Sequence, residues 1–330
     1  MTDQSVDPTT SIMVGIDIGG TKCAVSLGTM QAGRPAVSAR QQFPTPGTPA
    51  AALEQLIETM VQLLNAAGIA AADVAAVGIS CGGPLDSEAG LVLSPPNLPG
   101  WDRVDVLTPF QASLGPSVPV CLENDANACA LAEWQWGAGR GCRNMVFLTF
   151  GTGMGAGLIL DGRLYRGTNG MAGEVGHVRL AADGPLGYGK HGSFEGFCSG
   201  GGIASLFQLR LAQHLERGGT STLCVSPAPS AKDAAEAALA GDDLAITVFR
   251  EVGQRLGQGL AMLVDILNPE KIVIGSIYSR QQRLLAEPAL EELRREALAI
   301  NLDVCSVVPA FLGEAVGDFA SLAVASYGKK

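Results

Sequence analysis

Apolar and polar positions alternate along the chain in blocks that predict a mixture of strands and helices. The apolar run that starts at Ile12 passes through a glycine-rich turn into a second apolar run, which is typical of a β-hairpin. The segment from Thr48 to Ala67 has apolar residues at helical spacing and stops before Gly68. Val74 to Ser80 reads as a buried strand. Strand and helix patterns interleave from there on, so the fold class we predict is α/β.

The later elements are predicted from the same two periodicities. We expect strands over Ser117–Leu122, Met145–Phe150, Ala156–Leu160 and Lys271–Ile274, and helices over Asn124–Trp136, Gly201–Arg217, Asp242–Leu267 and Glu314–Tyr327. The polar segment Gly218–Ser230 contains Gly, Ser and Pro, and it predicts a surface loop.

Two segments of the chain are similar to each other. MVGIDIGGTKCAVSLG begins at Met13, and MVFLTFGTGMGAGLIL begins at Met145. Each reads as an apolar strand, a glycine-rich turn and a second apolar strand, and Gly19 meets Gly151 when they are superposed. Chance similarity of two hairpins is one interpretation. The other is a pair of related domains that each give a backbone-rich turn to one shared ligand.

Composition narrows the classes of partner. The 330 residues include 22 Lys or Arg and 32 Asp or Glu, a net charge of −10, which argues against binding the phosphate backbone of nucleic acid. The first residues carry Asp3 and Asp7 and no basic region, so we expect no signal peptide. The charge-free run Asn144 to Leu160 is shorter than the ~20 residues that cross a bilayer. We expect a cytoplasmic protein that binds neither nucleic acid nor a membrane.

The cysteines give no sign of a metal site or a disulfide framework. All eight are scattered, with no CxxC or CxC pair, whereas zinc sites show such pairs and disulfide scaffolds are short and rich in cysteine. We therefore interpret most of them as buried thiols in a reducing compartment.

The first glycine-rich turn, from Asp17 to Lys22, has the groups that bind a phosphate. Glycines let backbone N–H groups approach the anion, and Thr21 and Lys22 add a hydroxyl donor and a positive charge. Asp17 at the end of a strand suits a hydrated Mg²⁺. An ordinary hairpin turn with a solvated lysine is the alternative, because neither a P-loop nor a dinucleotide signature is present.

The second turn, Gly151-Thr152-Gly153, offers the same backbone donors without the charge. Glu123-Asn124-Asp125 follows a buried strand and opens a helix. Asn124 or Asp125 could simply cap that helix. Alternatively, Asp125 is an ionised carboxylate that accepts a proton from an attacking hydroxyl group.

A third group of polar residues lies in glycine-rich segments further along. Glu174 and His177 follow Arg166-Gly167-Thr168-Asn169-Gly170, and Glu195 comes after them. Carboxylates and an imidazole of this kind suit vicinal hydroxyl groups, since they accept or exchange hydrogen bonds. A structural role for His177 is equally open.

Together these segments resemble the ROK family of sugar kinases and sugar-responsive regulators, which is similar in architecture to hexokinase and actin. The resemblance covers nearly the whole chain and is carried by seven segments: DIGGTK, CGGPLD with Pro96-Asn97-Leu98 and Trp101, ENDANACALAEW, FGTGMGAG, NGMAGEVGH, the Gly192/Glu195 segment and LNPEKIVIG. It implies a two-domain actin-like ATPase (ribonuclease H-like) fold with an interdomain cleft. The N-terminal domain would be 1–122 plus 312–330, and the larger C-terminal domain 123–311.

The resemblance also implies a role for each matching residue. Asp125 would be the catalytic base for the sugar hydroxyl. The sugar would be bound by Gly83, Asn97, Asn124, Asp125, Glu174, His177 and Glu195. ATP would be bound by Asp17, Gly19, Gly20, Thr21, Lys22, Gly151, Thr152, Gly153 and Gly275, with Asp17 near Mg²⁺. The family also suggests a homodimer.

The chain departs from the family pattern in two places. Many members hold zinc with the histidine of the GH pair and three cysteines, but here Leu186, Tyr188 and Ser193 stand where the thiolates would be. One imidazole and those side chains cannot hold Zn²⁺, so we predict no structural zinc. The second departure is Ser276 after Gly275, where the family more often has paired glycines.

The function we predict is an ATP-dependent sugar kinase, glucokinase-like, that acts on a hexose or N-acetylhexosamine. The alternative is a non-catalytic sugar-binding regulator or partner protein of the same family. Family regulators carry a helix-turn-helix ahead of the core, and the eleven residues before the first predicted strand are too few for one.

Overall fold

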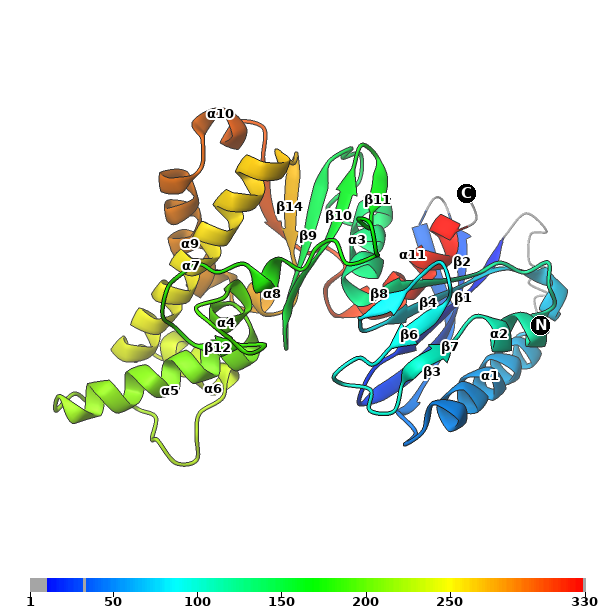
Figure 1. The fold of residues 1–330 in the computed structure, drawn as a ribbon, viewed down its shortest axis with the longest axis horizontal. Coiled ribbons are helices and arrows are strands. Elements are labelled where there is room, and N and C mark those ends of the chain that lie inside the picture. Colours follow the sequence, from blue (N-terminus) through cyan, green and yellow to red (C-terminus); the bar gives the residue numbers. More distant parts are fainter. Residues whose placement is uncertain (1–10, 32–33, 329–330) are drawn as a thin grey trace, which may run out of the picture. The chain divides into compact units, whose positions relative to one another are not determined.

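The computed structural model describes residues 11–31 and 34–328, and the chain forms two compact units. The first unit comprises Met1–Arg140, Leu164–Ala172 and Glu314–Lys330, and the second comprises Gly141–Arg163 and Gly173–Gly313. Each unit is built on a five-stranded sheet with helices packed against it (Figure 1). Three separate segments of the chain therefore form the first unit.

The sheet of the first unit has the strand order β3-β2-β1-β4-β8. Its strands are β1 (Ile12–Ile18), β2 (Lys22–Gln31), β3 (Arg34–Pro44), β4 (Val74–Cys81) and β8 (Val120–Asn124). β1 and β3 pair antiparallel with β2, whereas β1, β4 and β8 run parallel to one another. The carboxyl ends of β1, β4 and β8 thus meet at one edge of the sheet, which is where α/β sheets commonly bind ligands.

One face of this sheet carries an apolar core. The core side chains of β1 are Val14, Ile16 and Ile18, and they pack with residues of α1 (Pro49–Ala66) and α2 (Thr108–Leu114). α1 begins after Thr48, whose side chain accepts a hydrogen bond from the Ala51 N–H. Its buried side is a row at helical spacing: Ala52, Leu56, Met60 and Leu64.

The C-terminal helix α11 (Val316–Gly328) packs against β1 and β4, and α3 (Asp125–Trp136) packs against α11. Figure 1 shows α11 in red beside the blue and cyan strands. Glycines make this close approach possible, because a Cβ atom on Gly15 or Gly78 would collide with Ser321. Asp17 alternates with the core-facing residues of β1, so its side chain lies on the side that α11 covers.

The shorter elements of the first unit lie between α1 and β8. They are η1 (Ala71–Asp73) and a small antiparallel sheet of β5 (Leu85–Asp86), β6 (Leu91–Leu93) and β7 (Asp102–Asp105). Trp101 and Leu98 are buried beneath this part of the chain.

The second five-stranded sheet has the order β11-β10-β9-β14-β15, and apart from Leu164 and Tyr165 of β11 its residues belong to the second unit. Its strands are β9 (Met145–Phe150), β10 (Met154–Leu160), β11 (Arg163–Tyr165), β14 (Lys271–Ile274) and β15 (Ser306–Pro309). β9 pairs antiparallel with β10 and parallel with β14, which pairs parallel with β15. This repeats the arrangement of β2, β1, β4 and β8, so the two matching sequence segments occupy equivalent hairpins.

The helices of the second unit follow a glycine-rich stretch with little regular structure. That stretch holds η2 (Val175–His177) and the hairpin of β12 (Leu186–Gly187) and β13 (Lys190–His191). The helices are α4 (Phe194–Phe197), α5 (Gly200–Glu216), α6 (Ala231–Leu239), α7 (Asp243–Leu267), α8 (Ile277–Arg280), α9 (Gln282–Glu296) and α10 (Ala299–Leu302). η3 (Gly313–Ala315) leads back to α11. Across residues 11–31 and 34–328, no helix has the length and apolar character that a membrane span requires.

The units differ from the predicted domains in where the boundaries fall. We expected 123–311 to form one domain, but Asp125–Trp136 and Leu164–Ala172 belong to the first unit. The physical reason is that α3 packs against α11 and against β8, both of which are parts of the first unit.

Candidate functional site

The candidate residues of the first unit lie at the ends of three parallel strands, at one edge of its sheet. Asp17 of β1 lies beside Ser80 of β4, and Ser80 lies beside Glu123 of β8. The next row is Ile18, Cys81 and Asn124. The first glycine-rich turn, the Gly82-Gly83 segment and Asp125 therefore all begin at this edge.

The first turn is closed by its own backbone and by Thr45. Gly19 N–H donates to the Lys22 carbonyl at 3.1 Å, and Thr45 Oγ1 donates to the Gly19 carbonyl at 2.5 Å. Gly20, Thr21 and Lys22 are exposed at the tip. The turn is thus a fixed backbone loop that presents a hydroxyl group and an ammonium group to solvent.

Asn97 lies against both glycine-rich segments of this edge. A Cβ atom on Gly20 would collide with the Asn97 carbonyl, and one on Gly82 would come within 3.3 Å of Asn97 Oδ1. Gly83 has open space around the position of a side chain. The structure therefore brings Asn97, Gly20 and Gly82 together, with Gly83 facing outward.

Asn124 and Asp125 have different positions at the start of α3. Asn124 is the N-cap residue, and its Oδ1 accepts a hydrogen bond from Asn127 N–H at 2.7 Å. Asp125 is the first helical residue, its Oδ1 accepts from Ala126 N–H at 2.8 Å, and it stays exposed. The capping interpretation holds for Asn124, and the Asp125 carboxylate remains available for chemistry.

Besides burial, the charge of Asp125 contributes to a raised pKa of Asp17. Burial raises the pKa of Asp17 to about 6, and the charges of Asp125 and Asp318 add to the effect while Lys22 and Arg40 oppose it. Although the Asp125 residue exposes part of its surface, the protein atoms around its carboxyl group reduce its hydration and raise its pKa, and the hydrogen bond from Ala126 N–H opposes the rise. Such a pair of carboxyl groups at one edge is typical of sites that bind a cation or move a proton.

Glu123, next to Asn124, is a buried carboxylate held by an ion pair with the partly exposed Arg166. Its carboxylate is almost completely buried, accepts from Arg166 Nε at 2.6 Å and also from Arg166 Nη2, and accepts from Asn127 Nδ2 at 3.2 Å. Burial raises the pKa of Glu123, and Arg166 and Asn127 lower it. The sequence motif had suggested no role for Arg166, which here ties the returning segment Leu164–Ala172 to β8 and α3.

The second unit holds its glycine-rich turn with a carboxylate. Gly151 N–H donates to the Gly153 carbonyl at 3.1 Å, so this turn is one residue shorter than the first. Glu195, in the first turn of α4, accepts a hydrogen bond from Met154 N–H at 3.0 Å through Oε2. A Cβ atom on Gly153 would come within 2.8 Å of that oxygen, so a larger residue here would push the Glu195 carboxylate away from the turn.

Glu195 also lies against η2, the segment that carries the other two candidate sugar ligands. A Cβ atom on Gly176 would approach Glu195 Cβ to 3.2 Å. Glu174 lies two residues before Gly176 and His177 directly after it, and both side chains are exposed. The structure thus gathers Glu174, His177 and Glu195 in one part of the second unit, although one oxygen of Glu195 is already used by the turn.

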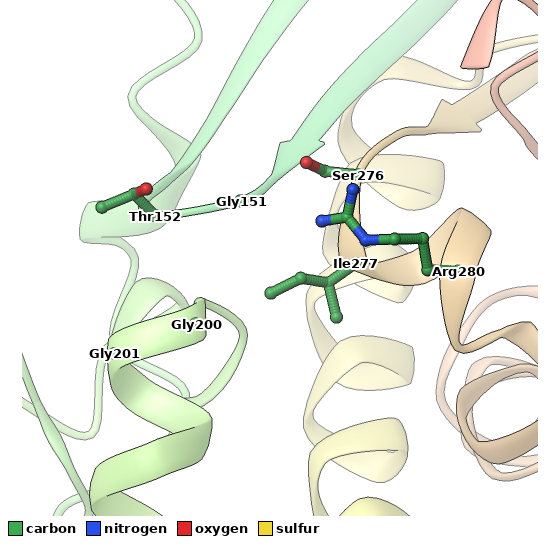
Figure 2. A pocket seen from close by; sticks show the side chains of 7 residues that line it. All are labelled: Gly151, Thr152, Gly200, Gly201, Ser276, Ile277 and Arg280. Atoms are coloured by element: carbon green, nitrogen blue, oxygen red, sulfur yellow. The ribbon is translucent and has the colours of Figure 1, made fainter. Parts of the chain in front are cut away.

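A pocket of about 370 Å³ lies beside the second turn. Its lining residues are Gly151, Thr152, Gly200, Gly201, Ser276, Ile277 and Arg280. In Figure 2, Thr152 and the start of α5 face Ile277 and Arg280 across this space. The backbone N–H groups at the start of a helix favour an anion, and the Gly200 N–H donates to the Gly151 carbonyl at 2.8 Å.

Gly275 is not among the pocket residues of the described chain, and its neighbour Ser276 is. A Cβ atom on Gly275 would meet the Phe147 ring at 3.1 Å, so this glycine serves packing. Ser276 has φ 58° and ψ −117°, a conformation that glycine adopts far more readily. Gly200, Gly201, Ile277 and Arg280 were missed from the sequence, although the run Ser199-Gly-Gly-Gly at a helix start was a usable signal.

No metal cluster is evident within the part of the chain that the structure describes, since no group of three or more His, Cys, Asp or Glu side chains could hold an ion. Tyr188, which replaces one of the expected thiolates, instead contacts His177, with the ring centroids 5.0 Å apart. Ser193, another replacement, caps α4.

Comparison with known proteins places the chain among sugar kinases and regulators. The profile of the ROK family matches residues 13–325. The chain is 30% identical to the glucokinase of Streptomyces coelicolor over 311 residues, 93% of this chain and 95% of that one. It is also 31% identical to the DNA-binding transcriptional repressor Mlc of Escherichia coli over 223 residues, 67% of this chain and 53% of the repressor.

A solved structure extends this similarity to the fold. The crystal structure of a ROK family glucokinase from Streptomyces griseus, in complex with glucose and AMPPNP, has a TM-score of 0.71 and 31% identity. The similarity covers 96% of this chain and 99% of that one. The predicted two-domain actin-like ATPase fold is thereby confirmed.

Proposed function

Because the chain belongs to the ROK family, we propose that it is an ATP-dependent sugar kinase. It would phosphorylate a hydroxyl group of a hexose or N-acetylhexosamine, as a glucokinase does. One observation carries the proposal: the exposed carboxylate of Asp125 stands at the same sheet edge as Asp17 and the first glycine-rich turn.

Asp125 would act as the general base. A sugar hydroxyl attacks the γ-phosphoryl group in line and loses its proton as the new P–O bond forms, while the bond between the γ-phosphorus and the bridging oxygen breaks and ADP leaves. Asp125 is positioned at a helix N-terminus, where an ionised carboxylate is favoured, and its raised pKa makes it a stronger base than an ordinary aspartate.

The first turn would bind phosphate, and Asp17 would hold Mg²⁺. Exposed Lys22 and the Gly20 backbone suit phosphate oxygens. One carboxylate fits Mg²⁺, which keeps several waters, and a cation would favour the ionised form of Asp17 against the burial and the repulsion that raise its pKa. Bound Mg²⁺ would neutralise phosphate charge during the transfer.

The second unit would supply the remaining contacts. Its pocket beside Gly151 and Thr152, together with Gly275, would receive the adenosine end of ATP. In addition to Asp125, the proposed sugar ligands are six residues: Gly83, Asn97, Asn124, Glu174, His177 and Glu195. Glu195 has one oxygen left for a hydroxyl group, since the other accepts from Met154 N–H.

Five further expectations belong to the proposal. The protein would be a cytoplasmic homodimer and would bind neither nucleic acid nor a membrane. It would hold no structural zinc, because Leu186, Tyr188 and Ser193 offer no thiolate. Elemental analysis of purified protein checks the last point, and a stoichiometric zinc content would refute it.

The second candidate function is a non-catalytic sugar-binding regulator or partner. The similarity to the repressor Mlc favours it. Such a protein would bind a sugar without releasing ADP, so turnover separates the two candidates.

A coupled ADP-release screen across hexoses, N-acetylhexosamines and their epimers tests the proposal, with polyphosphate tried in parallel as donor. We expect one sugar class to stimulate ADP release strongly in the presence of Mg²⁺. Sugar binding without ADP release, and without phosphate transfer from ATP or polyphosphate, would favour the regulator.

A further inference from the structure

The tip of the β12–β13 hairpin carries a tyrosine where a small residue is expected. Leu186 pairs with His191 and Gly187 with Lys190, so the turn consists of Tyr188 and Gly189 alone. Both have positive φ, 46° and 75°. Two positive φ values define a type I′ turn, in which Asn-Gly or Asp-Gly is strongly preferred and a bulky first residue is disfavoured.

The Tyr188 side chain contacts His177, which explains its presence. The two ring centroids lie 5.0 Å apart with the planes tilted by 36°, within the range of favourable aromatic pairs. Tyr188 is 68% exposed, so the contact with His177, and not burial of the tyrosine ring, accounts for a tyrosine at this position.

The same hairpin holds the backbone of His177. Lys190 Nζ donates to the His177 carbonyl at 2.6 Å, and Arg179 Nη1 donates to the His191 carbonyl at 2.7 Å. Phe194 N–H donates to the Val178 carbonyl at 2.8 Å, which fixes the following residues as well. His177 is therefore held at its carbonyl by Lys190 and at its imidazole by Tyr188.

This arrangement matters because His177 is exposed and would otherwise rotate freely about its side-chain bonds. We propose that Tyr188 is a positioning residue that fixes the His177 imidazole for a hydroxyl group of the acceptor sugar. The inference rests on the proposed sugar site and identifies which neighbour orients one of its ligands. It requires sugar binding but not catalysis, so it can fail independently of the kinase proposal.

The substitution Tyr188→Asn gives a sharp test, because Asn-Gly suits a type I′ turn better than Tyr-Gly. The hairpin should be retained, and thermal denaturation should show an unchanged or higher Tm. Calorimetry with glucose, mannose, N-acetylglucosamine and N-acetylmannosamine identifies the tightest-binding sugar for the wild type. For that sugar we expect Kd to rise about three- to tenfold in Tyr188→Asn and to stay within about twofold in Tyr188→Phe, which keeps the ring.

A double-substitution cycle shows whether Tyr188 acts through His177. In a His177→Ala background, Tyr188→Asn should weaken sugar binding no further. An equal loss in both backgrounds would overturn the inference, as would an unchanged Kd in Tyr188→Asn alone. A marked fall in Tm would also contradict it, because the effect would then come from a damaged hairpin.

The imidazole itself provides a readout that a merely structural role would not move. The chain has three histidines, so the His177 proton resonances can be assigned with single substitutions of the other two. Loss of the Tyr188 ring should move the His177 resonances downfield, whereas Tyr188→Phe should leave them in place. If the wild-type protein binds a sugar but does not phosphorylate it, the kinase proposal is refuted and the role of Tyr188 can still hold. If the wild-type protein binds no sugar, both the kinase proposal and the role of Tyr188 are refuted.

Discussion

Asn124 and Asp125 are neighbours of similar chemistry that serve different purposes. Asn124 has extended backbone angles, φ −70° and ψ 159°, and its side chain caps α3, which stabilises a helix by about 1 kcal/mol. Asp125 is already helical and is left exposed. The sequence could not decide which residue caps, because Asn and Asp are nearly equal N-cap residues and only the backbone distinguishes them.

Asp17 gives a prediction that concerns stability and pH. Its pKa in the folded protein, about 6, exceeds the ordinary value of 3.8. The folded state therefore binds the proton more tightly, and the stability contributed by this group falls as pH rises from about 4 to about 6. Asp17→Asn removes that penalty, so we expect the free energy of unfolding at pH 7.5 to increase, by up to about 3 kcal/mol.

Urea denaturation at pH 7.5 and at pH 4 measures this effect. The stabilisation by Asp17→Asn should be largest at pH 7.5 and nearly absent at pH 4, while Mg²⁺-dependent turnover is lost at both. An equal stability difference at the two pH values would contradict the account.

Ser276 gives a second prediction at this scale. Its positive φ and its ψ of −117° cost a non-glycine residue on the order of 1–3 kcal/mol. We expect Ser276→Gly to raise Tm by a few degrees, with the matched exposed change Ser117→Gly, at a serine without positive φ, giving no increase. A lower Tm in Ser276→Gly would show that the serine hydroxyl, near Gly151, stabilises the turn more than the backbone strain costs.

Part of the site could be read from residue type and part could not. Asp17, Lys22 and Asp125 stand out because charged residues next to glycines or helix starts suggest chemistry. Arg166 did not, because its partner Glu123 lies 43 positions away and only the fold brings them together. Gly275 was expected beside the nucleotide from its motif position, and this expectation stays a prediction. The structure adds that Gly275 packs against Phe147 and that its neighbour Ser276 lines the pocket.

At the scale of elements, periodicity located most of the framework. The strands β1, β4, β9 and β14 are almost uniformly buried, so their apolar runs were clear. β3 was missed because it is an exposed edge strand, RPAVSARQQFP, without regular apolar alternation. α9 was missed because Pro288 and many charged residues obscure its pattern, yet Pro288 is buried against Gly253 of α7.

The ion pair between Glu123 and Arg166 predicts a large effect on the elements that it joins. Arg166→Ala would leave a buried carboxylate unpaired beneath β8 and α3, and we expect a loss of about 3–5 kcal/mol in the free energy of unfolding. Adding Glu123→Gln should recover part of that loss, because it removes the buried charge.

A second ion pair provides the control. Arg143 and Asp161 are 74% and 70% exposed, so Arg143→Ala should change stability by no more than about 1 kcal/mol. Urea denaturation compares all four proteins. If Arg166→Ala proved as mild as Arg143→Ala, the Glu123 pair would have no anchoring role.

For the whole molecule, the repetition of one hairpin explains how two units come to present similar turns. Both sheets place an antiparallel hairpin beside two parallel strands. Only the first turn carries Asp17 and Lys22, so the phosphate and metal chemistry we propose is concentrated in one of the two copies. The fold class followed from the order of elements, whereas the unit boundaries depended on the packing of α3 against α11, which no local pattern records.

The central claim is that Asp125 removes the proton from the sugar hydroxyl during phosphoryl transfer. The most direct measurement compares the turnover of Asp125→Asn and wild type at saturating ATP, Mg²⁺ and sugar, with sugar Kd determined for both by calorimetry. We expect the rate to fall by about 10²–10⁴-fold while Kd changes by less than about threefold. Near-normal turnover in Asp125→Asn would contradict the account.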